Sequence, residues 1–335
     1  MLYRSLGRSG MKVSQICLGT FNFSNPTSEE DSIKIVERAS VAGINFLDTS
    51  NNYTNGESER IVGRAIARIG NRHNFVVATK AHFPVGPSPN DSSNSRVHLV
   101  RACEDSLRRL GTDYIDLYQL HRPSFDIPVD ETLRALTDLI QQGKVRYIGC
   151  STFPAWKVME SLMASEVKNL ARFISEQPPY NLLDRRIENE LVPLCQAYGI
   201  GIIPYAPLAQ GVLAGRYSVA KDFPADTRAG RLGGVFVGRV NQSGIEIGKQ
   251  LSDLARRHDL QPAQLPLLWV KDQPGITAPI FGPRTLDQLE GILPVLEMSL
   301  SDELRAACDK LVPPGSAVTN FHNGCTWMKQ QLVGA

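Results

Sequence analysis

Short apolar runs alternate along the chain with segments in which apolar residues recur every three or four positions. The runs are continuous and rich in branched side chains, which is typical of strands buried on both faces. They are Gln15–Leu18, Phe46–Asp48, Phe75–Thr79, Ile115–Leu120, Val145–Gly149, Arg172–Glu176, Gly201–Tyr205 and Thr277–Phe281. The pattern therefore predicts eight buried strands.

The segments between these runs follow the helical period. In 96–110, for example, Val97, Val100, Leu107 and Leu110 fall on one stripe. Similar stripes predict helices over Ser32–Ala42, Glu59–Ile69 and Val129–Gln142. Strands that alternate with helices indicate a parallel sheet, and eight strands can close into a barrel. We predict an α/β chain with one domain over residues 1–335, a (β/α)8 TIM barrel; an open doubly wound sheet is the rival that strand counting leaves open.

Three regions depart from this rhythm. Residues 1–14 predict a β-hairpin whose turn lies between Gly7 and Gly10. Residues 208–242 form a Gly- and Arg-rich loop after the seventh strand, too long to lack a role in a compact domain. The C-terminal tail after Leu311 includes aromatic side chains that must pack or bind something.

The composition indicates a globular protein with small-molecule chemistry. Of the 335 residues 42% are apolar and 21% charged, and the formal net charge of +2 favours neither nucleic acid nor an anionic membrane as a partner. The sequence has neither an apolar run of spanning length nor a secretory leader pattern. Six scattered cysteines indicate reduced thiols in a cytoplasmic protein without a metal site. A homo-oligomer is compatible with the sequence but is not predicted.

Polar side chains follow the predicted strands at their carboxyl ends, where barrels carry their function. Asp48, Lys80 and His121 end strands two, three and four, and Tyr53 lies in the loop after Asp48. Each taken alone has an ordinary structural explanation, such as a helix cap or a solvated edge. Their placement on adjacent strands predicts that the four meet at one end of the barrel. The next strands end at Ser151, Gln177 and Tyr205.

These four side chains are suited to carbonyl reduction. A tyrosine hydroxyl has a pKa of about 10, and a close ammonium lowers it by roughly one to three units. Lys80 is the candidate ammonium, Asp48 would hold it, and His121 would orient a carbonyl oxygen that Tyr53 protonates. No side chain supplies hydride, so this chemistry requires a cofactor.

The cofactor site is expected in the barrel loops, because no Gly-x-Gly-x-x-Gly follows any predicted strand. Barrels bind phosphate with the loops after strands seven and eight. Gly211 and Gly215 allow close backbone approach in the first of these loops, and Arg216 adds charge. In the second loop, Gly282 and Arg284 precede a predicted helix start, which favours anion binding.

Eight segments in order resemble the aldo-keto reductase family across nearly the whole chain. Gly7 to Thr20 is similar to the branch that includes bacterial aldo/keto reductases and potassium-channel β-subunits. Gly43 to Tyr53, Ala78-Thr-Lys80 and Asp116 to Pro123 match the segments of the family's catalytic tetrad. Gly143 to Ser151, Gln177 to Asn181, and Tyr205 to Leu213 match its nicotinamide and pyrophosphate segments.

The resemblance implies an NADP(H)-dependent oxidoreductase that interconverts a small carbonyl compound and its alcohol. Asp48, Tyr53, Lys80 and His121 would be the tetrad. Tyr205 would stack on the nicotinamide, with Ser151 and Gln177 on its carboxamide, and Arg284 would meet the 2′-phosphate. The full set of implied cofactor residues is Gly19, Thr20, Asp48, Ser151, Gln177, Tyr205, Pro207, Leu208, Gln210, Gly211, Leu213, Arg216, Arg228, Gly282, Arg284 and Gln288. Phe21, Phe83, Phe153 and Trp327 are the candidates for the substrate pocket wall.

The sequence departs from the family pattern at two places. Thr152 stands where the family often has Asn, and Gly291 and Ile292 stand where an acidic residue and Asn usually contact the adenine. A cofactor-binding regulatory subunit like the channel β-subunits is the alternative function, although those typically carry Asn in place of His121. A Schiff-base lyase that uses Lys80 as nucleophile is a third and poorer interpretation, because Asp48 and the long anion-binding loop do not suit it.

Overall fold

All eight predicted runs contribute to one parallel sheet in the computed structural model, which describes residues 2–323. The strands are β3 (Cys17–Gly19), β4 (Phe46–Asp48), β5 (Val76–Ala81), β6 (Ile115–Leu120), β7 (Val145–Ser151), β8 (Phe173–Gln177), β9 (Gly201–Ile202) and β10 (Ile280–Phe281). Strands β3 to β9 are neighbours in chain order, and β10 returns to pair with β3. Strands β9 and β10 are shorter than the predicted runs. Pro204 and Pro279 lie within those runs, and because proline has no N–H to donate, the regular hydrogen bonding between strands is interrupted there.

The sheet closes on itself. The backbone N–H of Thr277 donates to the carbonyl of Ile202, and that of Ile280 to the carbonyl of Pro204, both at 2.8 Å. These bonds join the β10 segment to the β9 segment, so the two edges of an open sheet are absent here. The (β/α)8 barrel is confirmed, and the doubly wound alternative is wrong.

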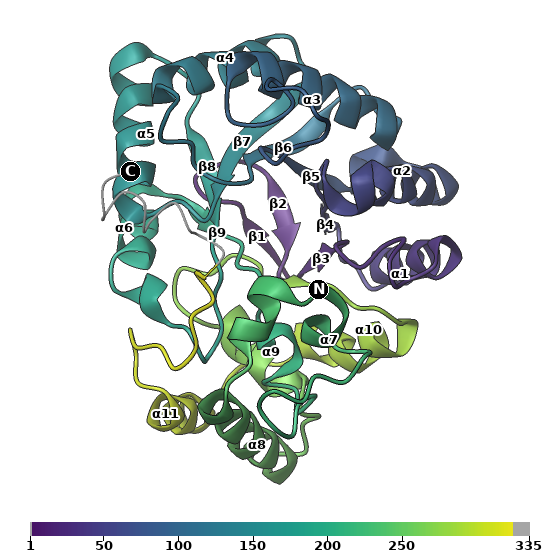
Figure 1. Ribbon diagram of the computed structural model, residues 1–335, viewed down its shortest axis with the longest axis vertical. Coiled ribbons are helices and arrows are strands. Elements are labelled where there is room, and N and C mark those ends of the chain that lie inside the picture. The colour runs from purple at the N-terminus through teal and green to yellow at the C-terminus, as the bar shows by residue number, and fades with distance from the viewer. Residues whose placement is uncertain (1, 324–335) are drawn as a thin grey trace.

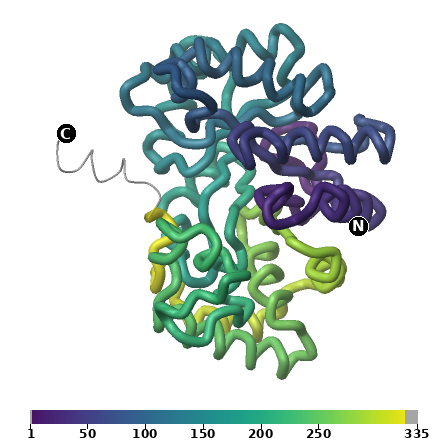
Figure 2. Tube along the Cα trace, turned by 45° about the vertical axis from the view of Figure 1, so that its right-hand side comes forward, coloured from purple at the N-terminus to yellow at the C-terminus, as the bar shows by residue number. Residues whose placement is uncertain are grey.

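Helices surround the strands in Figure 1 as an outer ring. Their bounds are α1 (Glu29–Val41), α2 (Glu57–Ile69), α3 (Arg96–Leu110), α4 (Val129–Gln141), α5 (Ala155–Lys168), α6 (Leu191–Tyr198), α7 (Arg228–Leu232), α8 (Gln242–Arg257), α9 (Gln264–Lys271), α10 (Leu286–Ile292) and α11 (Asp302–Leu311). Local signals set the ends: Ser95 caps α3 by accepting from the His98 N–H, and Gly111 ends it in the left-handed region. Figure 2 shows α1 beside α10, so the first and last parts of the barrel are neighbours.

The predicted N-terminal hairpin forms, with β1 (Tyr3–Ser5) paired to β2 (Lys12–Ser14). It lies at the centre of the ring in Figure 1. Leu6 and Val13 are fully buried against the residues that fill the barrel interior, among them Phe46 and Leu117. A side chain at Gly7 would clash, because a Cβ there would lie 2.3 Å from the Ile174 carbonyl oxygen. The hairpin therefore closes the amino end of the barrel and leaves the carboxyl end for the site.

Strand alternation decides which side chains enter the barrel. Along β5, Val76 and Ala78 belong to the interior cluster, while Val77 packs outward against the helices. The same alternation places Lys80 inside at the carboxyl end, next to Gln119 in the register of β5 and β6. The inward-facing polar residues at the carboxyl ends of the strands thus form a layer above the apolar interior of the barrel.

Two features are absent from residues 2–323. None of the helices there combines the length and apolar character that a bilayer crossing needs. Nor do three or more His, Cys, Asp or Glu side chains gather there in a way that could hold a metal ion.

Candidate active site

The four predicted side chains of the carboxyl end lie together. The Lys80 ammonium donates to Asp48 Oδ2 at 2.6 Å, to the Thr49 carbonyl at 2.7 Å and to the Tyr53 hydroxyl at 3.4 Å. The rings of Tyr53 and His121 meet edge to face with centroids 5.8 Å apart. Lys80 is completely buried behind Asp48 and Tyr53, and the other three line one cavity. An amine, a carboxylate, a phenol and an imidazole therefore share one end of the barrel.

The buried pair of Lys80 and Asp48 is well satisfied. Asp48 Oδ1 accepts from the amides of Gln119 at 3.2 Å and Gln177 at 2.9 Å, while its other oxygen faces the ammonium. Burial by itself lowers the pKa of Lys80, but the nearby Asp48 and Tyr53 raise it by more, so it lies above its ordinary value. Lys80 is therefore charged at neutral pH and stays fixed beneath the phenol.

His121 is held as a neutral ring. Burial, with the positive charges of Arg122 and Lys80, lowers its pKa well below the ordinary value for histidine. Its Nδ1 lies 3.1 Å from the Ser50 hydroxyl, which is also 2.7 Å from Asn52 Oδ1. Ser50 has one proton to give, so its choice of acceptor decides which ring nitrogen carries the proton. When Nδ1 accepts from Ser50, the opposite nitrogen carries the hydrogen and can donate to a carbonyl oxygen.

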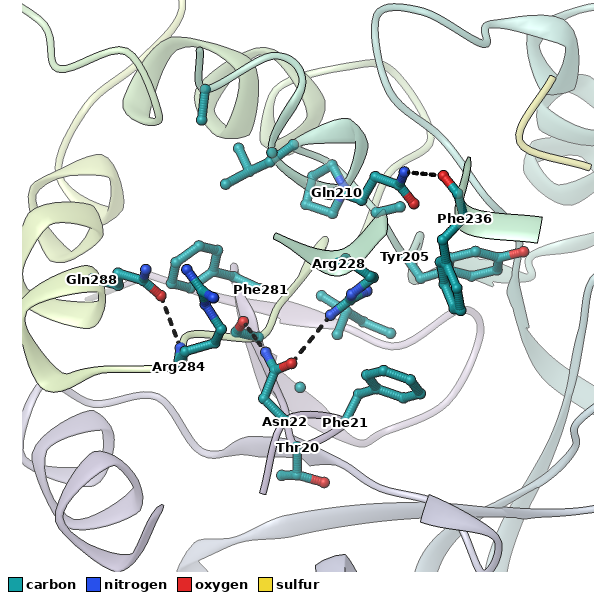
Figure 3. Close-up of a pocket in the computed structure, with 18 of the residues that line it drawn as sticks. Thr20, Phe21, Asn22, Tyr205, Gln210, Arg228, Phe236, Phe281, Arg284 and Gln288 are labelled. Carbon is teal, nitrogen blue, oxygen red and sulfur yellow. Dashed lines mark hydrogen bonds between the residues drawn. The ribbon is translucent and has the colours of Figure 1, made fainter. Parts of the chain in front are cut away.

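A cavity of about 760 Å³ extends from these residues along the loops after β9 and β10. Figure 3 shows side chains from three loops converging on it: Thr20, Phe21 and Asn22 after β3, Tyr205, Gln210 and Arg228 after β9, and Arg284 and Gln288 after β10. A space of this size lies within the usual range of roughly 300–1,000 Å³ for ligand sites. Of the predicted cofactor residues, all line the cavity except Leu213.

The far end of the cavity is rich in arginine. Arg216 and Arg284 both contact the carboxylate of Asp226. Arg284 also donates to the backbone carbonyl of Asp226. Arg231 lines the same region and donates to Asn25 at 2.9 Å. Three guanidiniums and two carboxylates, those of Asp226 and Asp287, line the cavity here, so net positive charge remains, which suits a phosphate-bearing ligand.

The end of the cavity near Asp48 is lined by Ser151, Gln177 and Tyr205. Ser151 donates to the Gln177 carbonyl at 2.9 Å, which ties β7 to β8 at this point. Glu176, on the outer side of β8, accepts from the Phe153 N–H at 3.0 Å and from the Gln177 N–H. Burial raises the pKa of Glu176 to about 8. The carboxyl group of Glu176 thus fixes the loop that follows Ser151.

Thr152 adopts a left-handed conformation with φ of 59°. A β-branched residue is strained there, whereas Asn enters this region readily. We predict that Thr152→Asn raises the free energy of unfolding by about 1 kcal/mol, because strain of this kind costs about 1–3 kcal/mol. Thermal and denaturant unfolding would measure it, with Thr152→Ala as the control that removes the hydroxyl without gaining tolerance of positive φ. An Asn variant no more stable than the Ala variant would contradict the strain.

Three predicted residues lie elsewhere or outside the described chain. Leu213 is fully buried in the core between sheet and helices. Phe153 is also buried in that core, with its ring 5.9 Å from that of Phe173. Phe21 and Phe83 do line the cavity, at ring distances of 5.0 Å from Tyr53 and 4.8 Å from His121. Trp327 lies outside the described residues.

The sequence reasoning missed several residues that the fold brings to the cavity. Gln119 lies within the apolar run Ile115–Leu120, and strand alternation is the signal that places it inward beside Lys80. Asp226, Phe236 and Gln261 come from loops or helix starts and line the cavity through long-range packing that no local pattern signals. The buried Gln210 Oε1 finds no partner between residues 2 and 323, which leaves an acceptor facing the site.

Comparison with known proteins agrees with this geometry. The sequence model described as "Aldo/keto reductase family" matches residues 15–313. The chain is 36% identical to "Uncharacterized oxidoreductase YrpG" of Bacillus subtilis, over 94% of this chain and 97% of that protein. It is 33% identical to "Versiconal hemiacetal acetate reductase" of Aspergillus parasiticus, over 90% and 94%. It is also 33% identical to "Probable voltage-gated potassium channel subunit beta" of Oryza sativa subsp. japonica, over 91% and 96%.

Proposed function

This chain belongs to the aldo/keto reductase family of oxidoreductases, and from that premise we propose that it reduces an aldehyde or ketone to the alcohol, reversibly, with NADPH. One observation carries the proposal most: the buried Lys80 ammonium contacts both Asp48 and the Tyr53 hydroxyl beside His121. This contact supports the proposal, because carbonyl reduction requires a proton donor and a group that orients the carbonyl oxygen.

Each side chain has a distinct task. Tyr53 gives its hydroxyl proton to the carbonyl oxygen, and Lys80 stabilises the phenolate left behind. Asp48 fixes Lys80, and the Gln119 and Gln177 amides fix Asp48. With Nδ1 accepting from Ser50, the neutral His121 ring would donate from its other nitrogen to the carbonyl oxygen without adding another positive charge to the site.

A nicotinamide dinucleotide fits the donor set of the cavity. A bound nicotinamide would supply the hydride that no side chain can supply. Tyr205, Ser151 and Gln177 would hold its ring end, close to Tyr53. Arg216, Arg231 and Arg284 would hold its phosphates, and Gly211 (φ 102°) lets the backbone approach where a side chain would strain the turn.

The choice of NADPH over NADH depends on Arg284 in this proposal. We predict that Arg284→Gln weakens NADPH binding by about 10–100-fold, the cost of one lost charged contact, and leaves NADH binding nearly unchanged. Asp226→Asn should act in the opposite direction, because it frees Arg216 and Arg284 from a competing carboxylate. Fluorescence titration with both dinucleotides measures the Kd values. Equal losses for NADPH and NADH in the Arg284 variant would contradict the assignment.

The direct test is NADPH oxidation by the purified protein with a panel of aldehydes and ketones. Turnover of at least one carbonyl compound is expected, with the corresponding alcohol as product. NADPH binding without turnover of any carbonyl would contradict the proposal.

A cofactor-binding regulatory subunit is the second candidate, favoured by the channel β-subunits among the relatives. The presence of all four tetrad side chains in contact distance argues for the enzyme, because a subunit that only binds cofactor has no need of a proton donor. Tight NADPH binding, no carbonyl turnover and a protein partner in pull-down together would favour this alternative.

A further inference from the structure

The half of the cavity around Tyr53 and His121 is both aromatic and positively charged. The rings of Phe21, Phe83 and Phe236 line it. Three guanidiniums line the same half: that of Arg122 after β6, and those of Arg228 and Arg239 after β9. Among the described residues that line this half, Asp48 is the only one with a carboxylate. That carboxylate is already paired with Lys80.

Arg228 lies over the aromatic wall. Its guanidinium carbon is 4.7 Å from the ring centroid of Phe21 and 6.0 Å from that of Phe236. Within residues 2–323, the Arg228 side chain makes one hydrogen bond, a long one of 3.4 Å to Asn22 Oδ1. Figure 3 shows the side chain directed toward Asn22 across the cavity. It forms no ion pair with any residue in that range. Burial lowers the pKa of Arg228 to about 10, so it still carries its charge at neutral pH.

Arg122 is the second such cation. It follows His121 directly, and its guanidinium carbon is 5.4 Å from the ring centroid of Phe83, which itself packs on His121. Arg122 NH1 donates to the His121 carbonyl at 2.5 Å, while its Nε is buried without a partner in residues 2–323. Within that range it makes no ion pair with an acidic side chain.

Guanidiniums removed from water are costly unless an anion or acceptor pairs with them. The phosphates of the proposed cofactor have their own arginines at the other end of the cavity, Arg216, Arg231 and Arg284. We propose that the substrate is an aromatic aldehyde or ketone that also carries a carboxylate, and that Arg122 binds this carboxylate while the ring packs on the aromatic wall beside His121; Arg228 adds positive charge to the same half. A planar carboxylate matches the forked donors of a guanidinium.

This inference rests on the proposed function for its chemistry. In the step, the carbonyl carbon accepts a hydride from NADPH and the carbonyl oxygen accepts the Tyr53 proton. NADPH is oxidised to NADP⁺, the carbonyl compound is reduced to an alcohol, Tyr53 regains a proton from solvent, and the carboxylate is unchanged. Arg122 would contact the substrate away from the reacting atoms, so its loss should act mainly on KM.

The kinetic test compares 4-carboxybenzaldehyde with its methyl ester, which has the same ring and aldehyde but no charge. The acid should have a kcat/KM at least about tenfold higher, since one charged contact is worth about that factor. Arg122→Gln should remove most of this preference and leave the ester nearly unaffected, and Arg122→Lys should retain part of it. An ester reduced as well as the acid by the wild type would overturn the inference. So would variants that lose the same factor on both compounds.

A binding test needs no turnover. Calorimetric titration of the NADP⁺-loaded protein with 4-(hydroxymethyl)benzoate and with its methyl ester should show at least about tenfold tighter binding of the carboxylate. Equal affinities overturn the inference even if both aldehydes are reduced. Preferential carboxylate binding with no turnover of either aldehyde upholds the inference and removes the proposed reductase function instead. NADPH titrated into Arg122→Gln should bind as tightly as to the wild type; a weakened Kd there would assign Arg122 to the cofactor and overturn the inference.

Discussion

Replacing Tyr53 by Phe is expected to lower kcat for carbonyl reduction by about 10²–10⁴-fold, the usual contribution of a positioned general acid. The change removes one oxygen and keeps the ring, which packs on Phe21 at 5.0 Å and on His121 at 5.8 Å. The cavity wall is therefore preserved, and the Kd for NADPH should change little. Steady-state kinetics with NADPH and a reactive aldehyde measures kcat, and fluorescence titration measures the Kd.

The matched control removes a phenol from the other end of the barrel. Tyr114 precedes β6 at the amino end, where its hydroxyl lies 3.1 Å from His73 Nδ1 near the surface. Tyr114→Phe should leave kcat unchanged. If Tyr53→Phe kept kcat within about tenfold of the wild type, Tyr53 would not be the proton donor, because a general acid contributes more than that.

The barrel could be predicted because its determinants are local. Eight apolar runs alternating with helical stripes leave few other arrangements, and polar residues at the ends of adjacent strands must then meet. Asp48, Lys80 and His121 come together for this reason, through the register of β4, β5 and β6. Tyr53 follows because the loop from Asp48 is only a few residues long.

Other parts of the site depend on contacts between segments far apart in the sequence. Asp226 reaches Arg284 across 58 positions, and Arg228 reaches Asn22 across 206. Phe153 follows a strand end as the site residues do, yet it packs outward on Phe173 because Glu176 fixes its backbone. A pattern of residue types carries no information on which side of a loop faces the cavity, so it could not separate Phe153 from Phe83.

Replacing Lys80 by Met is expected to lower both activity and stability. Lys80 is fully buried and donates to Asp48, Thr49 and Tyr53. Its loss leaves the Asp48 carboxylate buried with only the Gln119 and Gln177 amides, and a broken buried pair typically costs about 3–5 kcal/mol of unfolding free energy. Urea unfolding of the wild type and the variant measures this loss.

A second change separates the fold from the chemistry. Lys80→Met combined with Asp48→Asn removes both charges, so no uncompensated ion is left and most of the lost stability should return. Activity should not return, because nothing then stabilises the Tyr53 phenolate. The raised pKa of Lys80 allows a second test. The stability that the Lys80–Asp48 pair contributes is complete below the free-lysine pKa of about 10.4 and declines as the pH rises through the raised pKa of Lys80. The double variant should not show this decline. A double variant that recovered activity along with stability would show that Lys80 serves the fold alone.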